Sequence, residues 1–476
     1  MAIAGVDLFF SSAAELNAGW RKGNFSSEEL TKAYLDRLER LGPEHNALAV
    51  SLRKEAIKKA KDVDKDRKIQ RFRGRLQGVP FGAKDLLAWP GHPTTWGAKP
   101  YATQTFDDAA TVLKKLEKMG AVLIGKLAMV ELAGGPSYRW AKASLTGPCL
   151  NPWDKTRWAG GSSSGSGASV AAGMVGFALG SETSGSILTP SAFCGISGLR
   201  PTYGMVSRAG AMALSWTLDK LGPMARTVED CGIILDAIAG GDAGDPMSAG
   251  KGFVYAPQFS RPLSDYTVAY APVDWDEWVE PETRAAYAET LKVFKGMGMQ
   301  VKEMELPDFP YGALVGTIIQ AEAASIFEEL IASGKVDELA DERQIAGLKA
   351  ATEVLAKDYL KAMRIRRQVM SEFRSFFSET DMLLSPTRRG VANLVSQPLD
   401  SPAAAAPTER KRGLIGHIAA GNLAGLPALT MPCGLVNGLP IGVTVMSRAF
   451  NENALLAVGK EFQQRTDWHK RRPALA

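Results

Sequence analysis

The segment "AGGSSSGSGASVAAG", residues 159–173, decides between two very different structures for the middle of the chain. Its glycines and serines are typical of a flexible linker between domains. Linkers are polar and nearly repetitive, however, and this segment continues into "ASVAAGMVGFALG", residues 168–180, in which small and apolar residues dominate. Such residues suit a helix packed tightly against its neighbours. The sequence therefore predicts a helix here, with its backbone held close to other segments.

Two phosphate-binding motifs that are rich in glycine do not fit this segment. The P-loop pattern GxxxxGK[ST] requires a lysine after its second glycine, but Ser166 follows Gly165. The dinucleotide-binding pattern GxGxxG requires a third glycine where the chain has Val170. The segment therefore does not predict a nucleotide cofactor.

A third motif, the nucleophile elbow GxSxG, matches residues 161–165 with Ser163 at its centre. In an α/β-hydrolase this motif follows a strand and works with a later acid and histidine. The preceding residues 151–160 are rich in turn-forming residues, and we predict that they are not a strand. Only His417 and His469 follow, and His469 lies near the end of the chain. A GxSxG-type α/β-hydrolase is thus kept as an alternative.

The composition excludes several classes of protein. The 476 residues are 45% hydrophobic and 22% charged. The net charge of +5 is too small for this length to indicate a basic surface that binds nucleic acid. The four cysteines lie far apart, and neither they nor the four histidines have the spacing of a zinc site, so we expect neither a disulfide nor a metal. We also expect no cofactor. The N-terminus lacks signal-peptide features, and no run of about 18 apolar residues could cross a membrane. We expect a cytoplasmic protein that binds neither nucleic acid nor membranes.

Helical patterns alternate with short apolar segments along the chain. A capped amphipathic pattern at residues 26–42 predicts a helix, and residues 107–126 predict a helix followed by a strand. The same order returns within residues 282–306, and a long helical region from about 341 to 377 precedes a strand at 381–387. This alternation predicts an α/β fold with a central mixed β-sheet covered by helices on both faces.

A buried lysine is the first candidate catalytic group. Lys84 lies within "GVPFGAKDLL", residues 78–87, where apolar residues precede and follow it. A serine hydroxyl is a weak nucleophile unless a base removes its proton, and a lysine can do so only when it is neutral. Burial lowers the pKa of a lysine from its ordinary value of about 10.4. The segment "ETSGS", residues 182–186, adds glycine and hydroxyl groups, and its successive backbone N–H groups could surround one anion.

These segments together resemble the amidase signature family. The matching motifs are residues 78–87, the segment 160–173, and "GSILTPSAFCGISGLRPTYG" at 185–204. The resemblance continues through "LGPMARTVED" at 221–230 and "NLAGLPALTMPCGLVNGLPIGVTVM" at 422–446. Because the motifs occur in the expected order over nearly the whole chain, they imply an amidase, a hydrolase acting on carbon–nitrogen bonds other than peptide bonds.

The resemblance also implies how the chain is organised. It predicts a single compact amidase domain over residues 1–476, with a signature core at about 75–235. A variable helical region that caps the substrate would span about 305–410, and the C-terminal part of the core 415–476. Within the family, the chain looks most similar to free-standing bacterial amidases of the aryl acylamidase and urethanase type.

The family uses a Ser–cis-Ser–Lys triad, and three residues match its positions. Lys84 corresponds to the general base, Ser162 to the bridging serine after a cis peptide bond, and Ser186 to the nucleophile. Ser162 would relay protons between the other two while Ser186 forms an acyl-enzyme. The oxyanion hole would consist of the backbone N–H groups of Thr183, Ser184, Gly185 and Ser186.

The chain departs from the family pattern at several positions. The family commonly has "DxGGSIR", whereas the chain has Glu182, Ser184 and Leu188 at the aspartate, first glycine and arginine positions. Ser184 still supplies an N–H group, Glu182 keeps the acid, and Leu188 is expected to leave the surroundings more apolar. Arg388 and Arg389 replace a common proline-rich pattern near a substrate loop, where their default interpretation is two surface arginines.

A loop near the family's active site aligns with residues 134–147 and offers aromatic side chains for a substrate pocket. With a tryptophan farther along the chain, these aromatics would surround an apolar or aromatic acyl or amine group. The predicted pocket residues are Gly134, Gly135, Tyr138, Trp140 and Trp216.

The predicted substrate is a small hydrophobic or aryl amide, with carbamates (urethanes) and esters as further candidates. The sequence allows a monomer or a homodimer. One alternative is the glutamine-hydrolysing A subunit of a tRNA-dependent amidotransferase, which would need a partner protein, although the chain shows no convincing match to that enzyme's way of holding an amino acid. Another alternative is a non-catalytic binding protein on the same scaffold.

Overall fold

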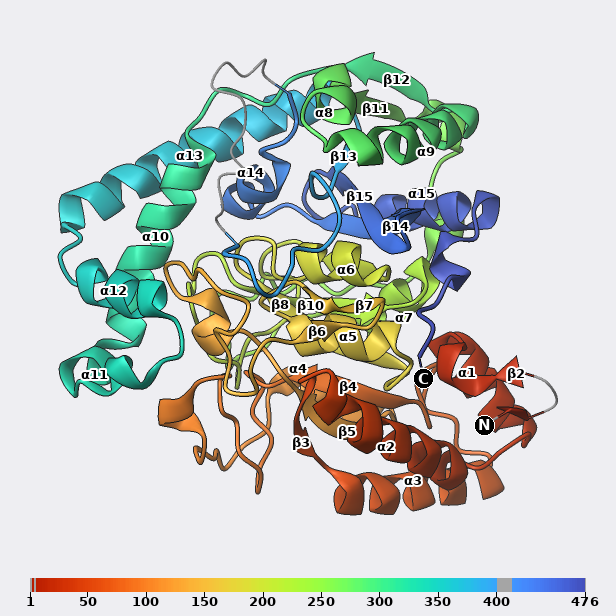
Figure 1. Ribbon diagram of the computed structural model, residues 1–476. Helices are drawn as coiled ribbons and strands as arrows, with labels where there is room; N and C mark the ends of the chain where they lie inside the picture. Colours follow the sequence, from red (N-terminus) through yellow and green to blue (C-terminus); the bar gives the residue numbers. More distant parts are fainter. Residues whose placement is uncertain (1, 4–5, 400–412, 476) are drawn as a thin grey trace.

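The computed structural model of the protein describes residues 2–3, 6–399 and 413–475. Its centre is a sheet of eleven strands (Figure 1). In spatial order these strands are β12 (Gln300–Glu303), β11 (Thr267–Tyr270), β13 (Met382–Pro386), β15 (Leu439–Ser447), β14 (Ala428–Val436), β9 (Ser197–Arg200), β10 (Lys220–Ala225), β8 (Phe177–Glu182), β4 (Pro80–Lys84), β5 (Val122–Leu127) and β3 (Leu48–Ser51). Two small sheets pair β1 (Ala2–Ile3) with β2 (Val6–Asp7) and β6 (Leu150–Asn151) with β7 (Asp154–Trp158).

The central sheet mixes parallel and antiparallel neighbours, as predicted. Strand β4 runs parallel to both β5 and β8, and β11 runs parallel to both β12 and β13. The other neighbouring strands are antiparallel. Because β4 and β8 are parallel neighbours, their carboxyl ends, at Lys84 and Glu182, lie at the same edge of the sheet. This edge brings two of the sequence motifs together.

Fifteen helices surround the sheet in the described part of the chain. Helices α10 to α13 lie together at one side of the molecule (Figure 1). The helices are α1 (Ala13–Lys22), α2 (Ser27–Glu44), α3 (Arg53–Lys68), α4 (Thr111–Lys118), α5 (Ser164–Ala171), α6 (Leu188–Cys194), α7 (Val228–Ile238), α8 (Pro272–Asp276), α9 (Arg284–Gly296), α10 (Tyr311–Ile326), α11 (Glu328–Ala332), α12 (Glu342–Ala351), α13 (Ala356–Glu379), α14 (His417–Ala424) and α15 (Glu452–Arg465).

Helices cover both faces of the central sheet, as predicted. Gly459 of α15 lies so close to β14 that a Cβ atom there would be 2.9 Å from the sulfur of Met431. Gly442 of β15, which pairs with Pro432, lies instead against Ala192 of α6. Because successive side chains of a strand point to opposite faces, α6 and α15 lie on opposite faces of the sheet.

Most of the local predictions are confirmed. Ser26 caps α2 and forms a capping box with Glu29. Strand β5 follows α4, β12 follows α9, and β13 follows α13, in the predicted order. The predicted helical region from about 341 to 377 consists of two helices, α12 and α13. Within the described ranges, no helix combines the length and the apolar character that crossing a membrane requires.

Two local predictions are wrong. The helix predicted over residues 168–180 ends with α5 at Ala171, and strand β8 begins at Phe177. The reason is Gly173, whose φ of +64° starts a tight turn and whose Cα lies against the backbone of Phe9. A short strand, β7, lies within residues 151–160, for which the sequence predicted none.

Candidate active site

Lys84 is the last residue of β4 and is fully buried. Its Nζ donates hydrogen bonds of 2.8 Å to Oγ of Ser162 and 2.8 Å to Oγ of Ser181. Burial lowers the pKa of this amine from 10.5 to about 7, although the charges of Asp219 and Glu182 oppose the shift. Near neutral pH a large fraction of Lys84 is therefore unprotonated, as a base must be.

Ser162 lies between this lysine and the "ETSGS" loop. The peptide bond that precedes it, from Gly161, is cis, as the family resemblance implies. The carbonyl of Ser162 accepts a hydrogen bond of 3.1 Å from the N–H of Val130. The next residue, Ser163, donates its N–H to the carbonyl of Ser186 at 3.3 Å. The two serine-bearing loops are thus joined directly, and Lys84 contacts one of them.

Ser186 lies at the end of a run of open backbone donors. In the part of the chain that the structure describes, no protein group accepts a hydrogen bond from the backbone N–H groups of residues 183–186. Gly185 has a φ of +92°, which a glycine adopts without strain. The φ angle of Ser184 is not positive, so this position accepts a serine without backbone strain. The Ser186 side chain keeps 8% of its surface exposed. These donors can hold the oxyanion of a tetrahedral intermediate.

Glu182 holds the loop of residues 183–186 in place through hydrogen bonds to the residues that follow it. Its carboxylate accepts the N–H groups of Ile187 and Leu188 at 2.9 and 3.1 Å, directly after the open donors. It also accepts hydrogen bonds of 2.9 Å each from Nη1 of Arg200 and Nδ2 of Asn422. Burial alone would raise the pKa of Glu182, but the charge of Arg200 and these hydrogen bonds lower it to about 2. The predicted acid is therefore an ionised anchor for the loop and the start of α6.

Replacing Glu182 with Gln is expected to lower the free energy of unfolding by about 3–5 kcal/mol at pH 7, because the buried Arg200 loses its carboxylate partner. The pKa of Glu182 is lower in the folded state than in the unfolded state. Its contribution to the free energy of unfolding is therefore complete above about pH 4.5 and is lost as the pH falls toward 2. Urea unfolding at pH 7 and pH 3 measures both effects.

The matched control for this variant is Glu229→Gln. Glu229 forms an ion pair of 3.5 Å with Lys460, and both side chains are about 40% exposed. Surface pairs of this kind contribute less than about 1 kcal/mol. Equal unfolding midpoints for the Glu182 and Glu229 variants would contradict the anchoring role of Glu182.

Two cavities flank the serine loops. The first, of about 170 Å³, has Ser181, Thr183 and Asp219 on one side, while its other walls are largely apolar and include Leu214 and Trp216. The second, of about 330 Å³, reaches Gly161 and Thr189 on either side of the loops. Its remaining walls include Tyr138, Trp158, Phe193, Glu280, Arg388 and Arg389. Both cavities therefore lie next to the serine-bearing loops.

The predicted pocket residues are divided between these places. Trp216 lines the first cavity and is 38% exposed, and Tyr138 lines the second. Gly134, Gly135 and Trp140 line neither cavity. Gly134 has a φ of +103° and lies under the ring of Tyr138, so it shapes the loop that carries this tyrosine.

That loop is tied to the helices at the side of the molecule. Oδ2 of Asp341, the N-cap of α12, accepts the N–H groups of Arg139 and Trp140 at 2.9 and 2.8 Å. The carboxylate of Glu131 in turn accepts the N–H groups of Ala340 and Asp341. Burial raises the pKa of Glu131 to about 7. The N-terminus of α12 thus helps to position the wall of the second cavity.

The sequence reasoning missed two residues of this site. Ser181 is the second hydrogen-bond partner of Lys84, and Asp219 accepts the hydroxyl of Thr183 at 2.5 Å. Finding Ser181 requires the knowledge that β4 and β8 are neighbours, which the local sequence does not contain. Asp219 also accepts the N–H groups of Leu214 and Ser215, so it joins the first cavity to the oxyanion loop.

The GxSxG alternative lacks its catalytic partners among the described residues. The hydroxyl of Ser163 is fully buried and exchanges hydrogen bonds with the backbone of Ser181 at 3.1 and 3.2 Å. The ring of His417 contacts the carbonyl of Leu414, and burial lowers its pKa to about 3. His469 lies at a different cavity. Ser163 therefore supports the loop rather than forming a triad with an acid and a histidine.

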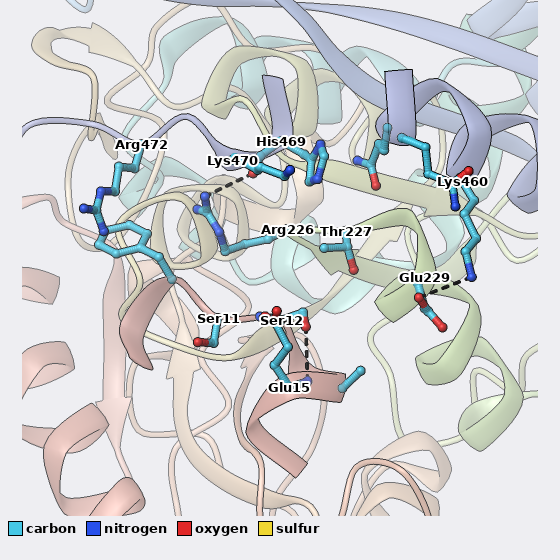
Figure 2. A pocket seen from close by; sticks show the side chains of 14 residues that line it. Ser11, Ser12, Glu15, Arg226, Thr227, Glu229, Lys460, His469, Lys470 and Arg472 are labelled. Carbon is cyan, nitrogen blue, oxygen red and sulfur yellow. Dashed lines mark hydrogen bonds and ion pairs between the residues drawn. The ribbon is translucent and has the colours of Figure 1, made fainter. Parts of the chain in front are cut away.

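That other cavity, of about 790 Å³, is larger but holds no predicted site residue. It lies between α1, α7, α15 and the C-terminal segment (Figure 2). Several of its polar side chains already have partners. Lys460 forms an ion pair with Glu229, the Ser12 hydroxyl donates to the Glu15 carboxylate, and Arg226 donates to the carbonyl of His469.

The fold and the cluster at its sheet edge define an α/β enzyme with a buried lysine hydrogen-bonded to the first of two joined serine-bearing loops. The Amidase family model matches residues 29–456, and the chain belongs to this family. Enzymes of this family act on carbon–nitrogen bonds.

Known proteins resemble the chain along its whole length. The A subunit of the glutamyl-tRNA(Gln) amidotransferase of Chromohalobacter salexigens is 36% identical, over 97% of each chain. The solved peptide amidase of Stenotrophomonas maltophilia has a TM-score of 0.82 and is 28% identical, covering 96% of this chain and 97% of its own. A bacterial aryl acylamidase has a TM-score of 0.85 over 98% and 100% of the chains, and at 22% identity it shows the fold alone.

Proposed function

We propose that the protein hydrolyses the carbon–nitrogen bond of small hydrophobic or aryl amides through a covalent acyl-enzyme, with Ser186 as nucleophile, Ser162 as proton relay and Lys84 as base. The observation that carries the proposal is the hydrogen bond of 2.8 Å from a fully buried lysine to the Ser162 hydroxyl, in a loop bonded to Ser186. A lysine that is fully buried and forms no ion pair in the described structure is a candidate for a catalytic group, because its pKa is lowered.

The first half of the reaction forms the acyl-enzyme. Neutral Lys84 accepts the proton of the Ser162 hydroxyl as Ser162 accepts the proton of Ser186. Oγ of Ser186 attacks the amide carbonyl, and the developing oxyanion binds the open N–H groups of residues 183–186. The proton then returns from Lys84 through Ser162 to the amine nitrogen, the carbon–nitrogen bond breaks, and the neutral amine leaves.

The second half releases the acid. A water molecule takes the place of the amine, Ser162 and Lys84 accept its proton by the same route, and the oxygen attacks the ester carbonyl. The second tetrahedral intermediate uses the same donors. Its collapse returns the proton to Ser186 and frees the carboxylic acid. Every proton in these steps is carried by the chain's own side chains.

The cavities support a substrate with an apolar or aromatic group. Met212, Leu214 and Trp216 line the first cavity, and Tyr138 and Phe193 line the second. Apolar walls with a few placed polar groups are typical of small-molecule sites. Carbamates and esters also carry a carbonyl group that Ser186 can attack, so they are candidate substrates of the same mechanism.

A second candidate function is the glutamine-hydrolysing component of a tRNA-dependent amidotransferase. The observation that favours it is the 36% identity to such a component over 97% of both chains. In that case the protein would form a complex, and the isolated chain would hydrolyse simple amides poorly.

A substrate panel with the isolated full-length chain separates the two candidates. We expect measurable kcat/KM for an anilide, a primary aliphatic amide, an aryl carbamate and an aryl ester, and little for glutamine. All activity is expected to vanish in the Ser186→Ala variant. Glutaminase activity that appears only after co-purification with a second protein, without anilide hydrolysis, would instead support the amidotransferase component.

A further inference from the structure

Arg388 lies beside the nucleophile loop, although it is far from that loop in sequence. It follows β13, and its Nε and Nη2 donate hydrogen bonds of 3.0 and 2.5 Å to the hydroxyl of Thr189. A Cβ atom on Gly185 would be only 3.8 Å from Nη2 of this arginine. The side chain is nonetheless exposed, because it lines the cavity of about 330 Å³. Arg388 therefore places a guanidinium in this cavity, beside the loop that carries Ser186.

The backbone around this arginine is held in place. The carbonyl of Arg388 accepts a hydrogen bond of 2.9 Å from the hydroxyl of Tyr287. The carbonyl of Arg389 accepts the N–H of Glu280 at 2.9 Å, and the N–H of Thr387 donates to the carbonyl of Gly442 at 2.9 Å. A guanidinium on such a fixed segment loses little conformational entropy when it binds a ligand.

No acidic side chain neutralises Arg388 among the described residues. Its hydrogen bonds go to Thr189, a neutral hydroxyl, and it forms no ion pair there. Glu182 is engaged by Arg200 and the loop N–H groups, and Glu280 lines the same cavity without pairing with Arg388. A guanidinium has five N–H donors, so those that do not bind Thr189 are available to an acceptor in the cavity.

This cation corrects one expectation from the sequence. With Leu188 at the family's arginine position, the sequence predicted more apolar surroundings for the nucleophile. Leu188 is indeed fully buried, but Arg388 brings a guanidinium to the neighbouring Thr189 from another segment. The charge thereby faces the cavity that Tyr138 and Phe193 also line.

We propose that Arg388 is a specificity-determining residue that binds a carboxylate group of the substrate in this cavity. The proposal rests on amide hydrolysis at Ser186 and narrows the substrate class to amides that carry a carboxylate a short apolar or aromatic spacer away from the scissile bond. Tyr138, Trp158 and Phe193 contact the spacer, while the guanidinium and the carboxylate form paired charge-assisted hydrogen bonds.

Two matched substrate pairs test this and show which side of the scissile bond the carboxylate occupies. Succinanilate and butyranilide differ by a carboxylate on the acyl side. The anilide 4-acetamidobenzoate and acetanilide differ by a carboxylate on the amine side. We expect the wild-type enzyme to favour the carboxylate member of one pair by about tenfold to a hundredfold in kcat/KM, chiefly through a lower KM.

Arg388→Met is expected to remove that preference, because kcat/KM falls more for the carboxylate member of the pair than for the neutral member. Arg388→Lys keeps the charge but loses the planar fork, so it should retain part of the preference. The control for net charge is Arg367→Met, on the exposed side of α13, which should behave like the wild type.

Two results would overturn the proposal. One is the absence of a carboxylate preference in both pairs with the wild-type enzyme. The other is an equal fall in kcat for charged and neutral members in Arg388→Met and Arg388→Lys, which would assign the arginine to the reacting carbonyl. In either case Ser186-dependent hydrolysis of the neutral anilides would leave the proposed amidase function standing, and its absence would refute that function separately.

Discussion

Replacing Ser186 with Ala is expected to lower kcat for amide hydrolysis by roughly five orders of magnitude, to the level left by binding and the oxyanion hole. The hydroxyl oxygen is the atom that forms the acyl-enzyme, and it belongs to the same loop as the open N–H groups of residues 183–186. The variant should fold normally, because no hydrogen bond of the Ser186 hydroxyl holds the described structure together. Single-turnover assays of the purified variant on an anilide measure the loss.

Labelling with a fluorophosphonate probe provides an independent readout. The probe forms a covalent bond with an activated serine, so wild-type protein should be labelled and Ser186→Ala should not. Ser163→Ala is the matched serine control, because Ser163 is the centre of the GxSxG match but is fully buried against Ser181. Labelling that survives in Ser186→Ala and disappears in Ser163→Ala would reverse the assignment in favour of the α/β-hydrolase alternative. Failure to label the wild type would favour a binding protein.

The parts of the site that the sequence could predict are those encoded within continuous motifs. Lys84, Ser162 and Ser186 each lie in a segment whose residue types and order are characteristic, so a single sequence suffices to align them with a family. The mixed sheet followed from the alternation of helical and strand patterns, which depends on local periodicity. These features depend little on which distant segments meet.

The parts that the sequence could not predict depend on contacts between distant segments. Ser181 contacts Lys84 because β8 pairs with β4, a choice made by the whole sheet. Arg388 contacts Thr189 across 199 positions, and its own neighbours indicate only a polar loop. The end of α5 shows the same limit, since Gly173 turns the chain where Phe9 packs. The local sequence therefore predicts which residues carry the chemistry better than it predicts the walls of the cavities around them.

Replacing Lys84 with Met is expected to lower kcat/KM by about 10³ to 10⁵, since both serine hydroxyls lose their proton acceptor. In the wild type, kcat/KM should fall about tenfold for each pH unit below about 7, because burial lowers the pKa of Lys84 to that value and only the neutral amine accepts a proton. A pH–rate profile between pH 5 and 9 on a neutral anilide locates this fall in kcat/KM, the acid limb of the profile. The residual activity of the variant should show no acid limb near pH 7.

The stability of the Lys84 variant separates a base from a structural lysine. Lys84 forms no ion pair in the described structure, and its pKa is lower in the folded state than the ordinary 10.5. Protonation of Lys84 near neutral pH therefore lowers the free energy of unfolding. Wild-type stability should therefore rise relative to Lys84→Met between pH 7 and pH 10.5, and the variant should unfold no more easily than the wild type at pH 7.

Lys126 is the matched comparison for this test, because it is also fully buried but pairs with Asp85 at 2.8 Å. Its replacement by Met leaves a buried carboxylate unpaired, which is expected to lower the free energy of unfolding by about 3–5 kcal/mol. The acid limb near pH 7 should persist in whatever fraction of Lys126→Met remains folded. If Lys84→Met instead unfolded like Lys126→Met while its remaining activity kept the wild-type pH profile, Lys84 would be a structural cation, and another group would have to accept the proton of Ser162.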